Sequence, residues 1–317
     1  MPLTRPLPAL LFTDRDPFPK AVPLVGVQGR RASGAKPLAL LALNHPVAPA
    51  DSVCELTGQT CLAGWNRLAE AILETSGLTK AFSGFTAVNN VDLRVETGSI
   101  HALIGPNGAG KTTCFNLLTK FLQPTSGTIQ FAGQDITALK PADVARRGMV
   151  RSFQISAVFG HLTAVENVRV ALQRDRGRNF DFWRSDRVLR RYNDRAHELL
   201  FDVGLSDAVD VPAAELSYGR KRALEIATTL ALEPMLMLLD EPTAGMTEAD
   251  VSRIVTLISR LRAGRTILMV EHNLSVVSGL SDKITVLTRG RILAEGDYPS
   301  VSTNPDVITA YLGTDHA

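Results

Sequence analysis

Residues 105–113 read GPNGAGKTT, which fits the phosphate-loop pattern GxxxxGK followed by Ser or Thr. Immediately before this stretch, residues 99–105 (SIHALIG) form a short apolar run that ends in glycine, as a central parallel strand does. Immediately after it, residues 111–122 (KTTCFNLLTKFL) carry apolar side chains at helical spacing. A chance glycine-rich loop would lack this strand and this helix. We therefore predict a strand, a phosphate-binding loop and a helix, in that order.

The residue types of the loop suit the binding of phosphate. Glycines let backbone N–H groups converge on phosphate oxygens without interference from a Cβ, and the helix N-terminus adds a positive dipole. We expect Lys111 to reach the β and γ phosphates of a nucleotide and the Thr112 hydroxyl to ligate Mg²⁺. The predicted nucleotide-binding residues here are Gly105, Pro106, Asn107, Gly108, Ala109, Gly110, Lys111, Thr112 and Thr113.

Two adjacent acids follow a second apolar run. Residues 235–240 (MLMLLD) predict a buried strand that ends at Asp240, on the edge where open α/β sheets bind ligands. Asp240 is predicted to bind Mg²⁺ directly or through water, and Glu241 to polarise a water molecule against the γ-phosphate. The alternative is an ordinary solvated strand end, which the apolar run and the following Pro242 disfavour.

The rest of the pattern predicts an α/β protein. Residues 140–230 are mostly helical in pattern, and residues 62–74 could form a short helix. Further strand signals lie at residues 76–82, 86–95, 127–133, 266–271 and 283–296, the last looking like two strands joined at Arg289–Gly290. Alternating strands and helices predict a parallel sheet covered by helices, and the lack of a long repeat predicts one nucleotide-binding unit.

Composition limits the partners and the compartment. The net charge of the 317 residues is +2 and no block of five basic residues occurs, which argues against a nucleic-acid partner. The three cysteines, Cys54, Cys61 and Cys114, lack the spacing of a disulfide framework or a zinc site. No apolar run is long enough for a transmembrane helix, and the N-terminus lacks a signal-peptide core. We expect a soluble cytoplasmic protein that could be peripheral to a membrane through a partner.

The first 70 residues differ from the rest. Nine of the 17 prolines fall in the first 50 residues, and no strand or helix period is visible there apart from residues 62–74. The favoured interpretation of residues 1–70 is a disordered extension. The alternatives are a segment upstream of the start codon that the cell uses, and a small functional appendage.

A second short Ser/Gly element, LSYGR, occupies residues 216–220 and precedes the helical pattern of residues 220–232. Ser217 offers a hydroxyl and Gly219 a bare backbone N–H at the start of a helix, which together can hold an anion. On its own this element could be a surface turn and a helix cap. Two phosphate sites in one monomer would be redundant, whereas in a head-to-tail pair each could complete the other's.

With these motifs in order, residues 72–313 resemble the nucleotide-binding subunit of ABC transporters. LSYGR is similar to the signature usually written LSGGQ, residues 153–154 (FQ) to the Q-loop, and residues 270–272 (VEH) to the segment of the switch histidine. The resemblance implies a RecA-like P-loop NTPase core with an antiparallel β subdomain and an α-helical signature subdomain over about residues 155–230. The nucleotide-binding domain would span residues 71–317.

The resemblance also implies roles for single residues, with ATP and Mg²⁺ as cofactors. Glu241 is then the general base, His272 contacts the γ-phosphate and orients Glu241, and Gln154 touches the metal and the attacking water. Phe82 would stack on adenine, with Phe85 as the alternative. Ser217 and Gly219 would cap the ATP held by a second subunit. The implied metal ligands are Thr112, Gln154 and Asp240.

Two positions depart from the family pattern. Residue 220 is Arg where the family usually has Gln, which adds a charge beside the signature. The segment at residues 243–246 reads TAGM, although the corresponding D-loop usually contains Asp. We expect the capping role of the signature to survive the first change, and the second weakens any expectation of the usual Asp contact between subunits.

Further segments resemble the branched-chain amino acid importer branch, whose ATPase is often called G-type. They are AVNNVDL (87–93), VRSFQ (150–154), WRSDRVLRRY (183–192), PTAGMTEAD (242–250) and NPDVITAYLG (304–313). This resemblance implies import of branched-chain or related amino acids. The alternatives are the ATPase of an amide or urea importer, the ATPase of lipopolysaccharide export, and a soluble ABC ATPase that acts outside transport.

The implied partners follow from the same resemblance. They are a second ABC ATPase subunit (another copy or a paralogue), membrane permease subunits reached through a groove near residues 153–167, and indirectly a periplasmic substrate-binding protein. The chain would then lie peripherally on the cytoplasmic face of the inner membrane. The resemblance also implies that the cargo does not touch this subunit, so its side chains form no pocket from which the cargo could be predicted.

Overall fold

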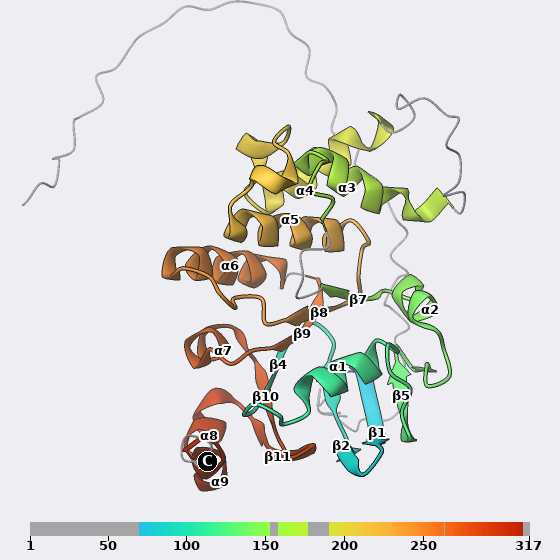
Figure 1. Cartoon of the computed structure of the whole chain (residues 1–317), viewed down its shortest axis with the longest axis vertical. Helices are drawn as coiled ribbons and strands as arrows, with labels where there is room; N and C mark the ends of the chain where they lie inside the picture. Colours follow the sequence, from blue (N-terminus) through green and yellow to red (C-terminus); the bar gives the residue numbers. More distant parts are fainter. Residues whose placement is uncertain (1–69, 153–157, 177–189, 263, 313–317) are drawn as a thin grey trace, which may run out of the picture. The chain divides into compact units, whose positions relative to one another are not determined.

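The strand that leads into the phosphate loop is β4 (Ile100–Ile104), and it lies inside a six-stranded sheet (Figure 1). The sheet has the order β11-β10-β4-β9-β8-β7. The other strands are β7 (Met149–Ser152), β8 (Leu236–Asp240), β9 (Thr266–Val270), β10 (Lys283–Thr288) and β11 (Arg291–Gly296). All neighbours pair in parallel except β11, which is antiparallel to β10. The segments that follow β4, β9, β8 and β7 therefore leave the sheet at one edge.

The computed structural model describes residues 70–152, 158–176, 190–262 and 264–312. All of them lie in one of the two units into which the chain divides, Gly64–Ala317. The proline-rich extension, Gln154 and most of residues 183–192 lie outside the described residues. The predicted domain boundary at residues 70 and 71 and the predicted range of the helical subdomain stay predictions.

Each inner strand of the sheet sends alternate side chains into two different cores, because successive residues of a strand point to opposite faces. On β8, Met237 and Leu239 join a core formed with the helices α3 to α9, whereas Leu236 and Leu238 join a core formed with α1 and the second sheet. Burial on both faces explains why these strands are continuous apolar runs.

The second sheet is antiparallel. Its order is β2-β1-β5-β6, with β3 also paired to β1. The strands are β1 (Ala71–Phe82), β2 (Phe85–Val91), β3 (Arg94–Glu96), β5 (Ser126–Phe131) and β6 (Gln134–Asp135). The helix expected over residues 62–74 is wrong for residues 71–74, which begin β1. Pairing with both β3 and β5 overrides the helical spacing of this short apolar run.

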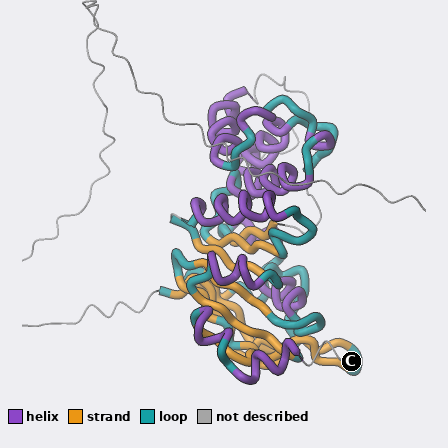
Figure 2. The backbone as a smooth tube through the Cα atoms, turned by 90° about the vertical axis from the view of Figure 1, so that its left-hand side faces the viewer, coloured by secondary structure: helices purple, strands orange, loops and turns teal. Residues whose placement is uncertain are grey.

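The helices gather in separate places along the described unit. Figure 1 has α3, α4 and α5 together at one end and α8 and α9 at the other, and Figure 2 has the strands below the upper helical part. The α-helices are α1 (Lys111–Leu118), α2 (Pro141–Arg146), α3 (Ala164–Leu172), α4 (Asn193–Asp202), α5 (Tyr218–Leu230), α6 (Glu248–Leu261), α7 (Leu274–Leu280), α8 (Tyr298–Ser302) and α9 (Pro305–Leu312). Short 3₁₀ turns lie at η1 (Gln173–Arg176), η3 (Ser206–Ala208) and η4 (Ala213–Glu215).

This architecture confirms the predicted α/β fold with an antiparallel β subdomain and a helical subdomain. The two strands expected to meet at Arg289–Gly290 are β10 and β11. Two strands were missed: β6 has only two residues, and β7 has four residues that fall inside the stretch that was helical in pattern. Within the described ranges, no helix has the length and apolar character needed to cross a membrane.

Candidate active site

The phosphate loop joins β4 to α1, and two of its glycines are required by the backbone. Gly105 has φ +148°, and a Cβ there would lie 2.1 Å from the carbonyl oxygen of Leu287. Gly110 has φ +103°, and its Cβ would lie 2.5 Å from the carbonyl oxygen of Ala87. Both neighbours are backbone atoms that cannot rotate away, so only glycine fits. The loop is thereby held against β10 and β2.

Lys111 folds back over the loop. It is buried, and its Nζ donates hydrogen bonds to the carbonyl oxygens of Gly105 (2.6 Å) and Pro106 (3.0 Å). Burial lowers the pKa of this ammonium group, an effect that the nearby charges of Glu241 and Asp240 oppose. Two carbonyl oxygens of the loop thus hold the Lys111 Nζ in place.

The start of α1 suits an anion. Its N-cap is Gly110, and no side chain caps the backbone N–H groups of the first turn. These donors and the Lys111 ammonium group together match the charge and the acceptor oxygens of a nucleotide phosphate. Thr112 is exposed in the same turn and Thr113 is half-buried, so the Thr112 hydroxyl is accessible to a metal ion. The residues present therefore fit ATP.

The turn between β10 and β11 braces the loop from behind. The N–H of Gly290 donates to the carbonyl oxygen of Ala109 (2.9 Å), and the N–H of Asn89 donates to the carbonyl oxygen of Gly290 (2.8 Å). Gly290 has φ +75°, and a Cβ there would lie 2.6 Å from the carbonyl oxygen of Ala87. Sequence analysis identified Arg289–Gly290 as a turn, but its contact with the loop depends on long-range pairing that the pattern does not reveal.

The acid pair lies where it was predicted, at the carboxyl end of β8. The Asp240 carboxylate is buried and forms an ion pair with Arg151 of β7. Arg151 also donates to Asn116 Oδ1 of α1 (2.6 Å), so it links two elements that flank the acid. Sequence analysis missed Arg151, because its only signal was a basic residue next to the FQ segment.

This ion pair bears on the predicted metal site. Asp240 offers oxygen to Mg²⁺, which commonly takes few protein ligands and keeps several waters, but one carboxylate oxygen already faces the guanidinium group. No group of three or more His, Cys, Asp or Glu side chains arranged for a metal occurs in the part of the chain that the structure describes. Thr112 and Asp240 fit a Mg²⁺ ion that also binds water and nucleotide, and Gln154 lies outside the described residues.

Glu241 has a backbone that few non-glycine residues adopt. Its φ is +45°, its N–H donates to the carbonyl oxygen of Val270 (2.9 Å), and its side chain is half-buried. Strained backbone of this kind persists where the surroundings enforce it, often at functional sites. His272 follows the next strand, β9, and is exposed. Glu241 and His272 therefore leave neighbouring parallel strands at the same edge of the sheet.

The signature element lies elsewhere in the unit. Ser217 is the exposed N-cap of α5 and its hydroxyl makes no capping hydrogen bond. Gly219 is buried, and a Cβ there would lie 2.7 Å from the Asp250 carboxylate. Figure 1 shows α5 well apart from α1, and α5 belongs to the helical end of the unit. The structure thus does not bring the signature onto the phosphate loop of the same chain.

Two neighbours of the signature have partners. Arg220 forms an ion pair with Asp207 of η3, so the charge added at this position is neutralised locally. The hydroxyl of Tyr218 donates to the carbonyl oxygen of Ala244 (3.2 Å), which ties the signature to the TAGM segment. The expectation of a higher local charge is therefore corrected by the pairing with Asp207.

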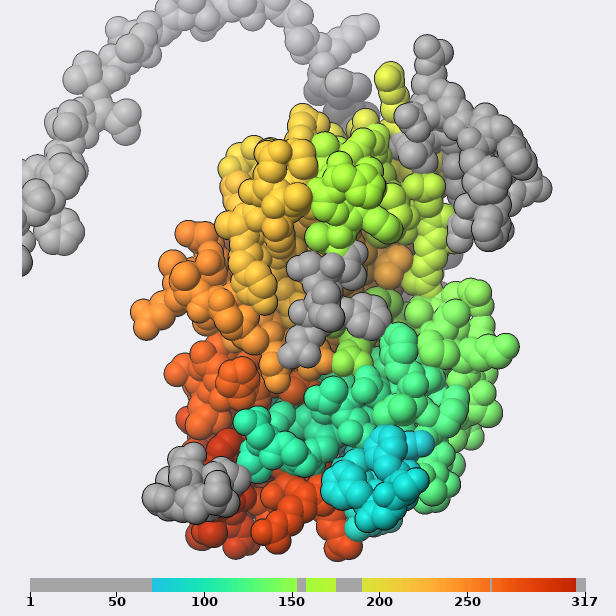
Figure 3. Space-filling view, in the orientation of Figure 1, coloured from blue at the N-terminus to red at the C-terminus, as the bar shows by residue number. Residues whose placement is uncertain are grey.

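The two candidate adenine-stacking rings lie at the β1–β2 turn. Phe82 and Phe85 are paired across the hairpin and are 44% and 62% exposed. Lys80 Nζ lies 5.3 Å from the centre of the Phe82 ring. In the space-filling view, the surface of this hairpin adjoins that of the loop and α1 (Figure 3). Either ring is accessible, and the choice of Phe82 stays a prediction.

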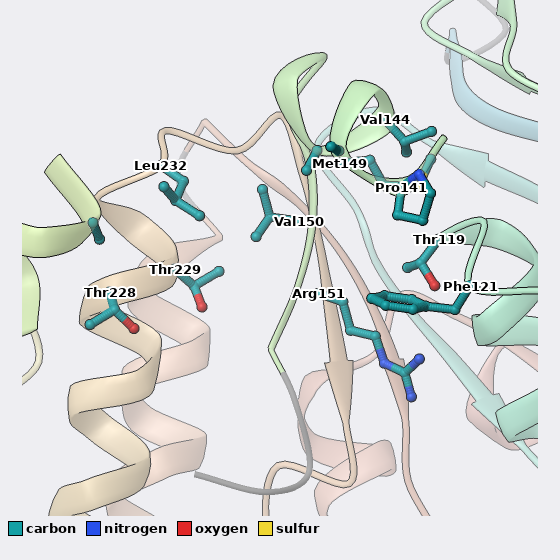
Figure 4. Close-up of a pocket in the computed structure, with 13 residues that line it drawn as sticks. Thr119, Phe121, Pro141, Val144, Met149, Val150, Arg151, Thr228, Thr229 and Leu232 are labelled. Carbon is teal, nitrogen blue, oxygen red and sulfur yellow. The ribbon is translucent and has the colours of Figure 1, made fainter. Parts of the chain in front are cut away.

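A separate apolar groove of about 420 Å³ lies between α1, α2, β7 and α5 (Figure 4). Phe121, which is 54% exposed, lies on one side of it near the Arg151 side chain. The groove is lined by Thr119, Phe121, Pro141, Ala142, Val144, Ala145, Met149, Val150, Arg151, Ala171, Thr228, Thr229 and Leu232. Arg151 thus lines the groove beside Phe121 (Figure 4) and also forms the ion pair with Asp240.

Comparison with known proteins agrees with this geometry. A protein-family model described as ABC transporter matches residues 88–244, and one described as branched-chain amino acid ATP-binding cassette transporter matches residues 291–317. The high-affinity branched-chain amino acid transport ATP-binding protein BraF of Pseudomonas aeruginosa is 42% identical over 256 residues, covering 78% of this chain and 99% of BraF. The protein of the same description from Escherichia coli K12, LivG, is 40% identical over 253 residues, with coverage of 78% and 99%.

Solved structures give the same result. A nucleotide-free ATP-binding cassette from an ABC transporter has a TM-score of 0.68 at 30% identity, covering 76% of this chain and 99% of its own. The ATP-binding cassette MJ1267, solved in its ADP conformation, has a TM-score of 0.67 at 30% identity, covering 77% and 99%. The chain therefore belongs to the ABC transporter family, as an ATP-hydrolysing ATP-binding cassette subunit with the P-loop NTPase fold.

Proposed function

We propose that this chain is the ATP-binding subunit of an importer for branched-chain or related amino acids, and that it hydrolyses ATP at a head-to-tail interface with a second ATPase subunit. The observation that carries the ATPase part is the order of the parallel strands. β4, β9 and β8 are neighbours, and the phosphate loop, His272 and Glu241 follow their carboxyl ends. The cargo rests on likeness to BraF and LivG, whose names state branched-chain amino acid transport.

The chemistry follows from the residues at this edge. ATP supplies the phosphoryl group that is transferred to water, and Mg²⁺ would neutralise charge on its phosphates. The glycine-rich loop and Lys111 bind and orient the phosphates, and Thr112 and Asp240 offer oxygens for the metal ion. Glu241 takes the proton of the attacking water, and His272 contacts the γ-phosphate and orients Glu241. Gln154 would complete the metal and water contacts.

The second subunit supplies the lid of each site. The exposed Ser217 hydroxyl makes no capping hydrogen bond to the first turn of α5. The hydroxyl and the N–H groups of that turn are therefore available to donate to a partner's phosphate. A two-fold pair would then contain two equivalent sites, each with the loop of one subunit and the signature of the other. The second subunit is another copy or a paralogue.

A membrane permease is the proposed partner. Residues 153–157 of the groove predicted near residues 153–167 lie outside the described residues, and we propose the groove beside Phe121 as the permease contact within the described residues. The groove is largely apolar and open, and Arg151 connects it to Asp240. Motion of a permease segment in this groove would therefore reach Asp240, which would offer oxygen to the metal ion. The chain would lie peripherally on the cytoplasmic face of the inner membrane, with a periplasmic binding protein delivering cargo on the other side.

Purification from detergent-solubilised membranes tests the transport part. The tagged full chain should bring down two permeases, and the periplasmic protein that binds this complex should bind leucine, isoleucine or valine. If the binding protein binds urea or an amide instead, the chain serves an importer of that cargo. If the chain brings down lipopolysaccharide-export proteins, its function is export and not import. Recovery with ribosomes or DNA and without permeases would contradict transport.

Replacement of Glu241 tests the ATPase part. Glu241→Gln removes the proton acceptor and keeps the shape, so turnover should fall about 10²–10⁴-fold while ATP binding persists and a dimer accumulates. The control is Glu198→Gln, which changes an exposed glutamate of α4 and should leave turnover unchanged. Normal turnover by Glu241→Gln would remove Glu241 as the base.

A further inference from the structure

Two loops at the active edge of the sheet share one buried carboxylate. Glu271 follows β9 and is 0% exposed. Its Oε1 accepts hydrogen bonds from the Thr243 N–H (3.0 Å) and the Thr243 hydroxyl (2.7 Å). Its Oε2 accepts from the N–H groups of His272 (3.2 Å) and Asn273 (3.4 Å). One oxygen therefore serves the loop after β8, and the other serves the loop after β9.

Burying the Glu271 carboxylate costs free energy that its hydrogen bonds must offset. A buried carboxylate is an acceptor-only group whose desolvation costs several kcal/mol unless donors surround it. Three of the four recorded donors are backbone N–H groups, so the carboxylate fixes main chain and not only side chains. Thr243 is only 5% exposed, so its hydrogen bonds to Glu271 are shielded from water.

The hydrogen bonds of Glu271 form a bridge between the loops after β8 and β9. These loops carry Glu241 and His272, the two residues proposed to act on the γ-phosphate. Thr243 is two residues beyond Glu241, and the N–H of Ala244 donates to the Glu241 carbonyl oxygen (3.1 Å), which closes a turn over Thr243. On the other side, Glu271 immediately precedes His272 and holds its N–H. A second link, from the Glu241 N–H to the Val270 carbonyl oxygen, joins the same two loops one residue earlier.

We propose that Glu271 is a positioning residue that sets the backbone of His272 relative to that of Glu241, so that the two loops move as one unit during hydrolysis. The inference rests on the proposed function, because it concerns the same reaction. Glu271 does not touch the nucleotide, and its effect passes through the residues that do. Loss of the bridge should lower the rate of the chemical step and leave nucleotide binding, which depends on the phosphate loop, nearly intact.

Glu271→Gln breaks the bridge with little change in shape. An amide has one acceptor oxygen and one NH₂ group, so one of the two loops must face a donor where it had an acceptor. We expect the kcat for ATP hydrolysis to fall roughly tenfold, the effect of losing one buried charge-assisted hydrogen bond, with the Kd for ATP changing less than about twofold. Thr243→Val removes the hydroxyl donor and keeps the backbone N–H donor of residue 243, so it weakens the same bridge from the other end and should lower kcat by roughly threefold.

Two further variants make the result specific. Thr243→Ser keeps the hydroxyl and should retain the wild-type kcat. The double variant Glu271→Gln with Thr243→Val should lose less than the product of the single losses, because the valine removes a contact already weakened by the amide. If Glu271→Gln does not fold, Thr243→Val against Thr243→Ser still tests the bridge.

The outcomes are separable from those of the proposed function. A wild-type chain without ATPase activity would contradict the proposed function itself. An active wild type, together with variants that melt at lower temperature but keep kcat per folded molecule, would give Glu271 a purely structural role and overturn the inference. Independent, multiplicative losses in the double variant would also overturn it.

Discussion

At the scale of single residues, the strand before the phosphate loop contains a buried histidine. His101 of β4 is 0% exposed, and its Nε2 lies 2.8 Å from Thr285 Oγ1 of β10. The Thr285 hydroxyl donates its proton to Glu295 Oε1 (2.8 Å), so Nε2 carries the hydrogen and Thr285 accepts it. Burial, with a smaller effect from the Lys283 charge, lowers the pKa of His101 from 6.5 to about 3.

This histidine predicts a loss of stability in mild acid. The folded pKa lies below the unfolded one, so the unfolded chain binds the proton better and stability falls as pH drops below 6.5 towards 3. Between pH 7 and pH 5 the His101 contribution to this loss is about 2 kcal/mol.

Urea unfolding at the two pH values measures the effect. The loss between pH 7 and pH 5 should be smaller in His101→Gln than in the wild type by about that amount. It should be unchanged in the control His197→Gln, which alters an exposed histidine of α4. An equal loss in all three proteins would mean that His101 is not held neutral by burial.

Local sequence patterns predicted only part of the candidate active site. The roles assigned to Lys111, Asp240 and Glu241 came from short local patterns, and the structure has these residues at the predicted strand and helix ends. Arg151 and Glu271 could not be found in this way. Their partners lie 89 and 28 residues away along the chain, and contacts of that separation depend on how strands are ordered in the sheet.

At the scale of elements, the β10–β11 turn and the phosphate loop act as one structure. Gly290→Ala would place a methyl group against the carbonyl oxygen of Ala87 in a backbone conformation that alanine avoids. The turn should shift and loosen its hydrogen bond to Ala109, at a cost of about 1–3 kcal/mol.

Isothermal titration with ATP tests this coupling. The Kd of Gly290→Ala should rise about tenfold, since 1.4 kcal/mol is a tenfold change. The matched control is Arg289→Gly, at φ +47°, which relieves rather than adds backbone strain and should bind ATP within about twofold of the wild type. Equal affinity of Gly290→Ala and the wild type would show that the turn does not support the loop.

Elements were predictable where burial on both faces leaves a mostly apolar run, as in β4, β8 and β9. They were not predictable where a strand is short and polar, as in β7 with Arg151 and Ser152, or where spacing is ambiguous, as at the start of β1. In both cases hydrogen bonds to strands that are distant in sequence decide the local structure. A short stretch of sequence does not reveal these partners.

At the scale of the whole molecule, the two phosphate-directed elements lie in different parts of the described unit. The loop and the acids lie at the edge of the central sheet, whereas Ser217 begins α5 at the helical end (Figure 1). The ion pair of Arg220 with Asp207 leaves the signature without an extra free charge. A centre shared between two subunits uses both elements, and a centre within one chain would leave Ser217 without a role.

Mixing two inactive variants tests this shared centre most directly. Lys111→Ala removes the ammonium group of the loop, and Ser217→Arg blocks the signature, so each variant alone should hydrolyse almost no ATP. In a mixed pair, one of the two sites combines the intact loop of one subunit with the intact signature of the other. Since half of randomly formed pairs are mixed, the mixture should regain about a quarter of the wild-type rate. For a pair made of two copies of this chain, a mixture no more active than the separate variants would contradict the account. For either kind of pair, a Ser217→Arg protein that hydrolyses ATP at the wild-type rate would contradict it.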